Sequence, residues 1–443
     1  MTQHTNLLDS KYGRLFTFGL LYVCEGVPLG FAAVAMAAYM RRQGMDVAQV
    51  GAFVGAFYLP WAFKWAWAPL VDLITLNRFG GRKAWISLCL IAMIVTLYGV
   101  AQIDYTQYFT LLITLVIVHN VFASTCDVAI DSLAVNALRE DERGLGNGFM
   151  FGGAYLGQGL GGGGAMFVAG LTNFTASFIY VSVLLLLVLL FVLFFVKDPS
   201  VAARVTQSAV NKTADVWRTF KATIAHFTRE LIVGFFKSGS GPKFGVLFAL
   251  LPLGAMTLSI ATSQTLQVDY GLTDTEIAQI NLYGTILSGI GCVVGGWIAD
   301  KLGHRLMLVI YYGLTVLPTL YFAFATGGDA GIHGISYVSF FAASLIYALV
   351  YGFHYGTSAA IFMGLTNPVI AATQFTGFMA LRNLTISYTS SWQGYAVDAW
   401  GYSTVFYLDS ALVILPILVI PFLKQRKVTE TAPSAGAPLP ESS

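Results

Sequence analysis

The sequence predicts an all-α membrane protein with twelve transmembrane helices in two six-helix halves. Three observations carry this prediction. The 443 residues are 56% hydrophobic and only 10% charged, and the mean hydropathy is +0.71. Apolar runs of spanning length recur along the chain. In each half of the chain, one such run ends in an aspartate followed by a basic turn, at Asp72 and at Asp300.

Composition identifies lipid as the solvent for most of the chain. A typical soluble domain carries about 25% charged residues, and a spanning helix needs roughly 20 predominantly apolar residues. Met1–Tyr12 is polar, and no cleavable signal peptide is expected. The predicted spans are 14–40, 48–72, 84–102, 108–136, 144–169, 176–196, 243–268, 275–300, 305–326, 335–365 (bent or broken), 372–397 and 402–423.

An internal repeat relates the two halves. The two aspartates lie 228 positions apart (300 − 72). Gly148–Met150 in the fifth predicted span recurs as Gly377–Met379 in the eleventh, at an offset of 229. Two matches at nearly one offset, in equivalent spans, are not expected by chance. Parallel halves related by an axis along the membrane normal are the build of the major facilitator fold.

The distribution of basic residues predicts the orientation in the membrane. With a cytoplasmic N-terminus, the segments outside the cytoplasm hold only Arg41 and Arg42, and all other loop lysines and arginines lie inside. Because basic residues accumulate in cytoplasmic loops, both termini are expected in the cytoplasm. The expected location is the inner membrane of a bacterium.

The one long polar stretch, residues 197–242, predicts a linker between an N-terminal bundle (1–196) and a C-terminal bundle (243–427). Residues 428–443, rich in Pro, Ala and Ser, are expected to be disordered. Within the linker, an amphipathic helix is predicted to lie on the membrane surface. Contact with lipid is the favoured role of that helix, and binding of a partner is the alternative. Its apolar residues are Trp217, Phe220, Ile224, Phe227, Leu231 and Phe235.

Ionisable residues within predicted spans are functional candidates, because charge is costly in a membrane. Two of them are histidines, His119 and His354, for which a packing role is favoured, although His354 remains a site candidate. The candidates are Glu25 in the first span, Lys64 in the second, His119, Asp127 and Asp131 in the fourth, His354 in the tenth and Arg382 in the eleventh.

Asp127 and Asp131 are four residues apart and share one helix face. Two carboxylates so close in a low-dielectric site do not both ionise easily. Lys64 and Arg382 are the available cations, and with Glu25 they leave one carboxylate without a fixed partner, which suits a proton carrier. A static ion pair between Glu25 and Lys64 is the alternative. The sequence leaves open whether Lys64 pairs with Glu25 or with Asp127.

Arg382 is expected to hold an anionic group of a solute, because the guanidinium fork matches carboxylate and phosphate. A structural partner role is the alternative. The cavity is predicted between spans 1, 4, 7 and 10, and the aromatic residues Tyr22, Tyr347 and Tyr351 are candidates to line it.

The aspartate-to-arginine turns predict a cytoplasmic gate. An aspartate at one helix end can pair with basic residues and helix N-termini of a neighbour in one conformer and separate in the other. The predicted pairs are Asp72 with Arg82 or Lys83, and Asp300 with Arg305. A purely topological role for the basic residues is the alternative.

Glycines and cysteines are assigned to packing. Gly153, Gly157 and Gly161 lie on one helix face at four-residue spacing, which lets helices approach closely. The four cysteines match neither a zinc site nor a disulfide framework. No metal and no cofactor are therefore expected.

Several motifs resemble one family, the peptide/acetyl-CoA/drug branch of the major facilitator superfamily. This branch includes AmpG-type muropeptide permeases, acetyl-CoA transporters and siderophore permeases. The resemblance covers the first five spans by motif and the remainder by topology and the turn after Asp300. The motifs are Glu25–Gly30 (EGVPLG), Leu59–Asp72 (LPWAFKWAWAPLVD), Gly81–Lys83 (GRK), Asp127–Asp131 (DVAID) and Glu142–Gly144 (ERG).

The resemblance implies proton-coupled import of a bulky polar solute, of the muropeptide or siderophore class, by a monomer. The partners expected are solute, proton and membrane lipid, and nucleic acid is not among them. A drug or metabolite exporter of the same fold and an acetyl-CoA-type transporter are the alternatives. An enzyme is not expected, because the chain shows no nucleophile–base pair at a membrane surface.

Overall fold

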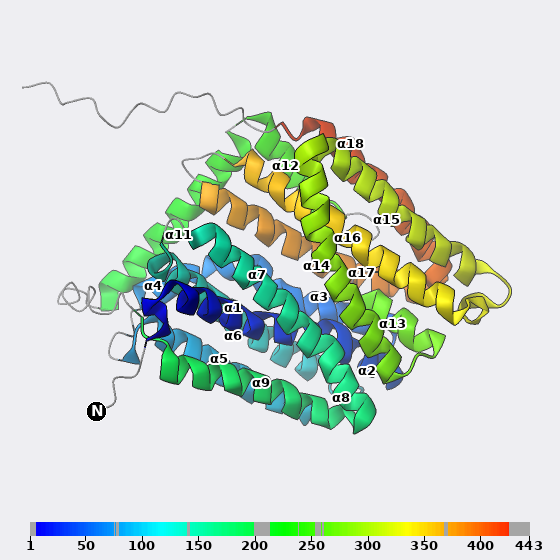
Figure 1. The fold of residues 1–443 in the computed structure, drawn as a ribbon, viewed down its shortest axis with the longest axis horizontal. Coiled ribbons are helices and arrows are strands. Elements are labelled where there is room, and N and C mark those ends of the chain that lie inside the picture. The colour runs from blue at the N-terminus through cyan, green and yellow to red at the C-terminus, as the bar shows by residue number, and fades with distance from the viewer. Residues whose placement is uncertain are drawn as a thin grey trace, which may run out of the picture.

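The computed structural model describes residues 6–74, 76, 79–139, 142–198, 213–237, 239–252, 258, 261–366 and 371–424. Within these residues all regular elements are helices (Figure 1). After the turn η1 (Leu7–Asp9), the first half comprises α1 (Lys11–Gly30), η2 (Phe31–Met36), α2 (Ala37–Arg42), α3 (Val47–Phe63), η3 (Lys64–Ala66), α4 (Ala68–Leu73), α5 (Arg82–Ala101), α6 (Phe109–Ala137), α7 (Arg143–Gly159), η6 (Leu160–Gly164), α8 (Ala165–Leu171) and α9 (Phe174–Phe195).

The second half follows the linker helix α11 (Thr213–Phe236). Its long helix α17 bends at Gly401, whose φ of 76° favours glycine. The elements are α12 (Ser240–Leu250), α13 (Ala261–Tyr270), α14 (Asp274–Leu302), α15 (His304–Gly327), η8 (Gly331–Gly334), α16 (Tyr337–Leu365), α17 (Ala371–Leu412), α18 (Ile414–Val419) and η10 (Ile420–Phe422).

The architecture agrees with twelve spans in two halves. Among the described residues, 8 helical stretches are long and apolar enough to cross a membrane. One of them, Gln374–Phe422, contains the bend at Gly401 and corresponds to two predicted spans. The other predicted spans are the interrupted ones, α3 with α4, α7 with α8, and α12 with α13.

Helix breaks occur at different places from those predicted. The predicted span 48–72 is interrupted at Lys64–Ala66, between Pro60 and Pro69. Proline lacks the N–H of the helix ladder and clashes with the preceding turn, but it fits the first turn of a new helix. By contrast, α16 contains no proline and runs unbroken, so the bend expected in 335–365 is absent.

The glycine stripe of α7 is confirmed as a packing surface against α1. A Cβ atom on Gly153 would lie 1.9 Å from the carbonyl oxygen of Gly19, and one on Gly161 would lie 1.9 Å from that of Val27. Backbones this close admit no side chain. The stripe therefore brings α1, the helix that carries Glu25, into direct contact with α7.

Gly157→Ala is expected to destabilise the protein by about 1–3 kcal/mol, the usual cost of overpacking. Its Cβ would lie 2.3 Å from the backbone oxygen of Val23. Gly152→Ala on the same helix is the matched control, because its Cβ would meet nothing within 4 Å. Thermal unfolding in detergent measures both, and equal stability of the two variants would contradict the close packing.

The linker helix α11 lies along the left edge of Figure 1 and packs against both halves. The ring of Phe227 stacks on Trp65 with centroids 5.9 Å apart, and Phe235 contacts Phe378 at 4.9 Å. Part of the predicted amphipathic face thus packs on protein. Ile232 and Phe236, which were not among the predicted apolar residues, are exposed. Contact of the helix with lipid stays a prediction. The domain boundaries also stay a prediction, and the tail 428–443 lies outside the described residues.

Candidate functional site

Lys64 forms an ion pair with Asp127 of α6, which answers the question that the sequence left open. The break at η3 places Lys64 beside α6, and two tryptophans that flank the break form hydrogen bonds with α6. Trp61 Nε1 donates to Asn120 Oδ1 at 3.1 Å, and Trp67 Nε1 donates to Thr125 Oγ1 at 3.1 Å. The alternative pair with Glu25 is not formed. Asp127 is buried, with 3% of its surface exposed.

Glu25 and Asp131, the two other carboxylates among the site candidates, have no cation as a direct partner among the described residues. The Tyr22 hydroxyl on α1 donates to Asp131 Oδ1 at 2.5 Å. One carboxylate oxygen of Glu25 is buried without a hydrogen-bond partner among the described residues. Lys64 lies within electrostatic range of Glu25, Asp127 and Asp131. These four residues therefore form one group, which we call the acidic cluster.

Arg382 was expected to balance the negative charge of the carboxylates, but its contacts lie elsewhere. Its Nη1 donates to Ser358 Oγ of α16 at 2.8 Å, and its guanidinium lies over the ring of Tyr355 at 4.6 Å. It is 4% exposed. The physical reason is its helix: α17 belongs to the second half, and Arg382 faces α16. Without Arg382, the cluster of three carboxylates and one ammonium carries a formal charge of −2 when all are ionised.

His354 lies beside Arg382 in the second half. It is 1% exposed, and its Nδ1 has no hydrogen-bond partner among the described residues. Its ring stacks on Tyr312 at 5.1 Å and meets Tyr351 edge-on at 4.7 Å. We call Arg382, His354, Ser358 and Tyr355 the basic site.

Both groups lie at a similar depth. We count from the helix ends on the side of the N-terminus, which are Ala137 of α6, Ala371 of α17 and Leu365 of α16. Asp127 is ten residues from its helix end, and Arg382 and His354 are each eleven residues from theirs. At 1.5 Å per residue, this corresponds to roughly 15–17 Å, about half of a hydrocarbon core of roughly 30 Å. The charged residues that the sequence singled out therefore occupy the middle of the spanning helices.

A set of tyrosines from both halves lies next to the basic site, and the sequence predicted only part of this set. Tyr347, Tyr351 and Tyr355 stack in succession along α16 with centroids 6.0 Å apart. From the first half, Tyr155 on α7 lies within electrostatic range of Tyr351 and Tyr355, and its hydroxyl is 3.5 Å from Cys292 Sγ. The four-residue spacing on α16 was the signal that could have added Tyr355.

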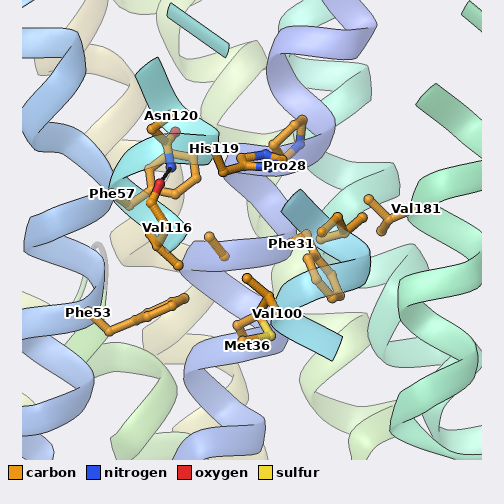
Figure 2. A pocket seen from close by; sticks show the side chains of 12 residues that line it. Pro28, Phe31, Met36, Phe53, Phe57, Val100, Val116, His119, Asn120 and Val181 are labelled. Carbon is orange, nitrogen blue, oxygen red and sulfur yellow. Dashed lines mark hydrogen bonds between the residues drawn. The ribbon is translucent and has the colours of Figure 1, made fainter. Parts of the chain in front are cut away.

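A separate small cavity of about 30 Å³ lies inside the first half, next to the π-helical segment η2. Figure 2 shows Phe31, Met36, Phe53 and Val116 around it. Its polar residues already have partners: His119 Nδ1 is 2.8 Å from Thr96 Oγ1, and Asn120 bonds Trp61 and the backbone of α6. His119 therefore has the packing role favoured by the sequence.

The halves are held together at the end remote from the N-terminus, on the right in Figure 1. Arg41 of α2 makes two hydrogen bonds, of 2.7 and 2.9 Å, with Asp269 of α13. Tyr402 also donates to Asp269 at 2.7 Å, and Arg42 pairs with Asp274 at 2.9 Å. We call these contacts the latch. Close packing of α3 on α17 continues it, because Ser387 Oγ donates to the Gly55 carbonyl at 2.7 Å.

At the end that carries the N-terminus, the ion pairs resolved among the described residues each join two residues of the same half. Arg82 contacts Asp198 and Ser132, and Lys83 donates to the Leu193 carbonyl at 2.7 Å. In the second half, Asp300 near the end of α14 pairs with His304 at 3.0 Å rather than with Arg305. His304 is the first residue of α15, and the turn at Gly303 (φ 99°) between the two helices brings it back beside Asp300. The side chain of Asp72 lies outside the described residues. The predicted gate pairs therefore stay a prediction for another conformer.

A buried ion pair at this same end fixes α1 to the start of α7. The Arg14 guanidinium donates two hydrogen bonds, of 2.8 and 2.6 Å, to Glu142. This contact lowers the pKa of the Glu142 carboxyl to about 2. The pair stays ionised at every pH relevant to a cell.

Weakening the latch with Arg41→Gln is expected to open the end remote from the N-terminus. A bidentate, charge-assisted contact between the halves would be lost, and the population would shift toward a conformer open at that end. The distance between spin labels attached through Gln107→Cys and Asp329→Cys, both in exposed loops there, measures the change. Lys301→Gln, at the other end, is the control, and unchanged label distances in Arg41→Gln would contradict the latch.

Comparison with known proteins agrees with this architecture. The chain is similar to a transporter named AmpG 4 of Rickettsia felis (26% identity, 94% of this chain and 97% of the relative). It is also similar to the anhydromuropeptide permease of Escherichia coli K12 (25% identity, 93% and 81%).

Two solved structures share the fold. They are an inward open conformation of the xylose transporter XylE from E. coli (TM-score 0.68, 11% identity, 95% of this chain and 98% of that chain) and a D-xylose-proton symporter (TM-score 0.69, 13% identity, 93% and 98%). The fold and the named relatives are those of multi-pass membrane transporters. The family model described as Major Facilitator Superfamily matches residues 18–390, and the chain therefore belongs to that superfamily.

Proposed function

We propose that the protein is a proton-coupled importer that carries a bulky polar solute across the inner membrane by alternating access. The observation that carries the proposal is the acidic cluster, in which one lysine faces three carboxylates at mid-depth. Ionisable groups at this depth mark proton and solute pathways in transporters. The similarity to an anhydromuropeptide permease supports a solute of the muropeptide class, and the siderophore class remains the second choice.

The coupling role falls to Asp131. The Lys64–Asp127 ion pair already neutralises one carboxylate and joins the break in the second span to α6. Among the described residues, Asp131 has the Tyr22 hydroxyl as its one direct partner, so its charge can be neutralised by a proton that arrives with the solute. Loss of that proton would restore the excess negative charge and favour a different conformer, which is the linkage that coupled transport requires.

The conformer observed fits release into the cytoplasm. With cytoplasmic termini, as the basic residues predict, the latch joins the two halves at the outer end. In the outward-facing conformer, Asp72 with Arg82 or Lys83, and Asp300 with Arg305, would form the inner gate. The protein would act as a monomer, with membrane lipid around it.

Uptake by proteoliposomes under an inside-alkaline pH gradient tests the proposal. Anhydromuropeptide and ferric siderophore are supplied side by side, with a protonophore as the control. Accumulation of anhydromuropeptide that the protonophore abolishes is the expected result. Accumulation that is indifferent to the protonophore would contradict proton coupling, and loss of preloaded solute in place of uptake would favour an exporter.

A further inference from the structure

We propose that the solute is dipolar, with an anionic group bound by Arg382 in the second half and a cationic amine bound by Glu25 in the first. This inference rests on the proposed transport function and adds the chemical class and orientation of the solute. It follows from two charged groups of opposite sign, the almost fully buried Arg382 and Glu25 with its buried carboxylate oxygen, one in each half. Among the described residues, neither has a partner of opposite charge at contact distance.

The anionic end is argued from Arg382. A guanidinium has five N–H donors, and the contacts resolved for Arg382 among the described residues are one hydrogen bond to Ser358 and aromatic faces. Neither interaction neutralises a charge that is almost fully buried. The adjacent His354 Nδ1 is likewise buried and unbonded in the described part of the chain. A planar carboxylate or a phosphate would accept the free donors in the geometry that a guanidinium favours.

The cationic end is argued from Glu25. The one lysine of the acidic cluster pairs with Asp127, and Asp131 has the Tyr22 hydroxyl. Glu25 is left with a buried carboxylate oxygen that no described donor reaches. An ammonium group of the solute has three donors and the charge required. This leaves Asp131 for the proton, so that solute amine and proton bind to different carboxylates.

We place the two ends in one site because they lie on opposite halves near the middle of their spans, Glu25 14 residues and Arg382 11 residues from the ends of α1 and α17 on the side of the N-terminus. At 1.5 Å per residue this corresponds to roughly 21 and 17 Å. Tyrosines of α7 and α16 lie beside the basic site, with aromatic faces and hydroxyl groups that suit an elongated polar solute. A solute that neutralises both charges at once favours the conformer in which the halves enclose it. A solute with one charge would leave the other buried and unpaired, which is costly.

Equilibrium binding to the full-length protein in detergent, without a pH gradient, tests the inference. The three probes are an anhydromuropeptide with a free amine and free carboxyl groups, the same compound with its amine acetylated, and the same compound with its carboxyl groups amidated. The wild-type protein is expected to bind the parent compound at least about tenfold more tightly than either derivative, since each derivative loses a charge-assisted hydrogen bond, the stronger kind.

Two variants assign the ends. Arg382→Gln is expected to lose the preference for free carboxyl over amide while keeping the preference for free amine, and Glu25→Gln is expected to show the reverse. Arg382→Lys and Ser358→Ala are expected to show intermediate losses of the carboxyl preference. They replace Arg382→Gln in the test if that variant does not fold. Lys301→Gln, on the surface, is the control for a general loss of positive charge.

The outcomes separate the two proposals. Equal binding of all three probes by the wild-type protein would overturn the dipolar solute and leave gradient-driven uptake intact. Loss of both preferences in either single variant would overturn the assignment of the two ends. Failure of the wild-type protein to bind any of the probes would contradict the muropeptide class itself, and the dipolar inference with it.

Discussion

Asp131→Asn is expected to abolish solute accumulation driven by a pH gradient while leaving solute exchange across the membrane intact. Asparagine resembles the protonated carboxyl in shape and can still accept the Tyr22 hydrogen bond, but it cannot release a proton. The variant would therefore behave as a carrier held in its protonated state. Proteoliposome uptake with an imposed gradient measures accumulation, and counterflow of labelled solute measures exchange.

The control for this substitution is Asp329→Asn, which removes a carboxylate from an exposed loop far from the acidic cluster. It is expected to accumulate solute like the wild-type protein. Full gradient-driven accumulation by Asp131→Asn would remove this residue from the coupling mechanism and direct attention to Glu25. Loss of exchange together with accumulation would indicate a defect in solute binding or folding instead.

Lys64→Gln is expected to destabilise the protein by about 3–5 kcal/mol, the usual consequence of leaving one member of a buried ion pair without its partner. Asp127 is 3% exposed and has Lys64 as its ion-pair partner. The double variant Lys64→Gln/Asp127→Asn is expected to recover most of that stability, because neither partner then carries a buried charge. Denaturant or thermal unfolding in detergent measures both, with Lys301→Gln as the matched surface control.

The same pair also has a functional consequence. Lys64 lies in the interruption between α3 and α4, so the ion pair connects a helix break to the helix that carries Asp131. We therefore expect the stable double variant to transport poorly, as Asp127→Asn alone should. A double variant as unstable as Lys64→Gln would show that packing of the two tryptophans, and not charge, governs stability here.

The charged residues at the centre could be found from the sequence, because a carboxylate or guanidinium within an apolar run is conspicuous wherever the run folds. Their partners could not. Glu25 and Asp127 were equally plausible partners for Lys64, and the choice depends on a helix break at Lys64–Ala66 that brings the ammonium beside α6. Arg382 was expected near the aspartates, but its contacts with Ser358 and Tyr355 hold it in the second half.

The latch could not be predicted from the sequence, for a different reason. In the sequence, Arg41 and Arg42 are only two basic residues on the less basic side of the membrane. Asp269 lies 228 positions further along, directly after the predicted span 243–268. Nothing local to either residue indicates the other, since the contact exists only when the two halves meet at that end.

The sequence by itself determined the solvent, the number and placement of spanning segments, the division into two related halves and the identity of the buried charges. These features depend on local composition and on residue order, because a segment partitions into lipid according to its own apolar content. The tertiary structure alone decided which charges neutralise each other, which remain unpaired and which end of the molecule is closed. Those outcomes depend on distances of a few ångströms between helices that are far apart in the chain, and packing sets such distances.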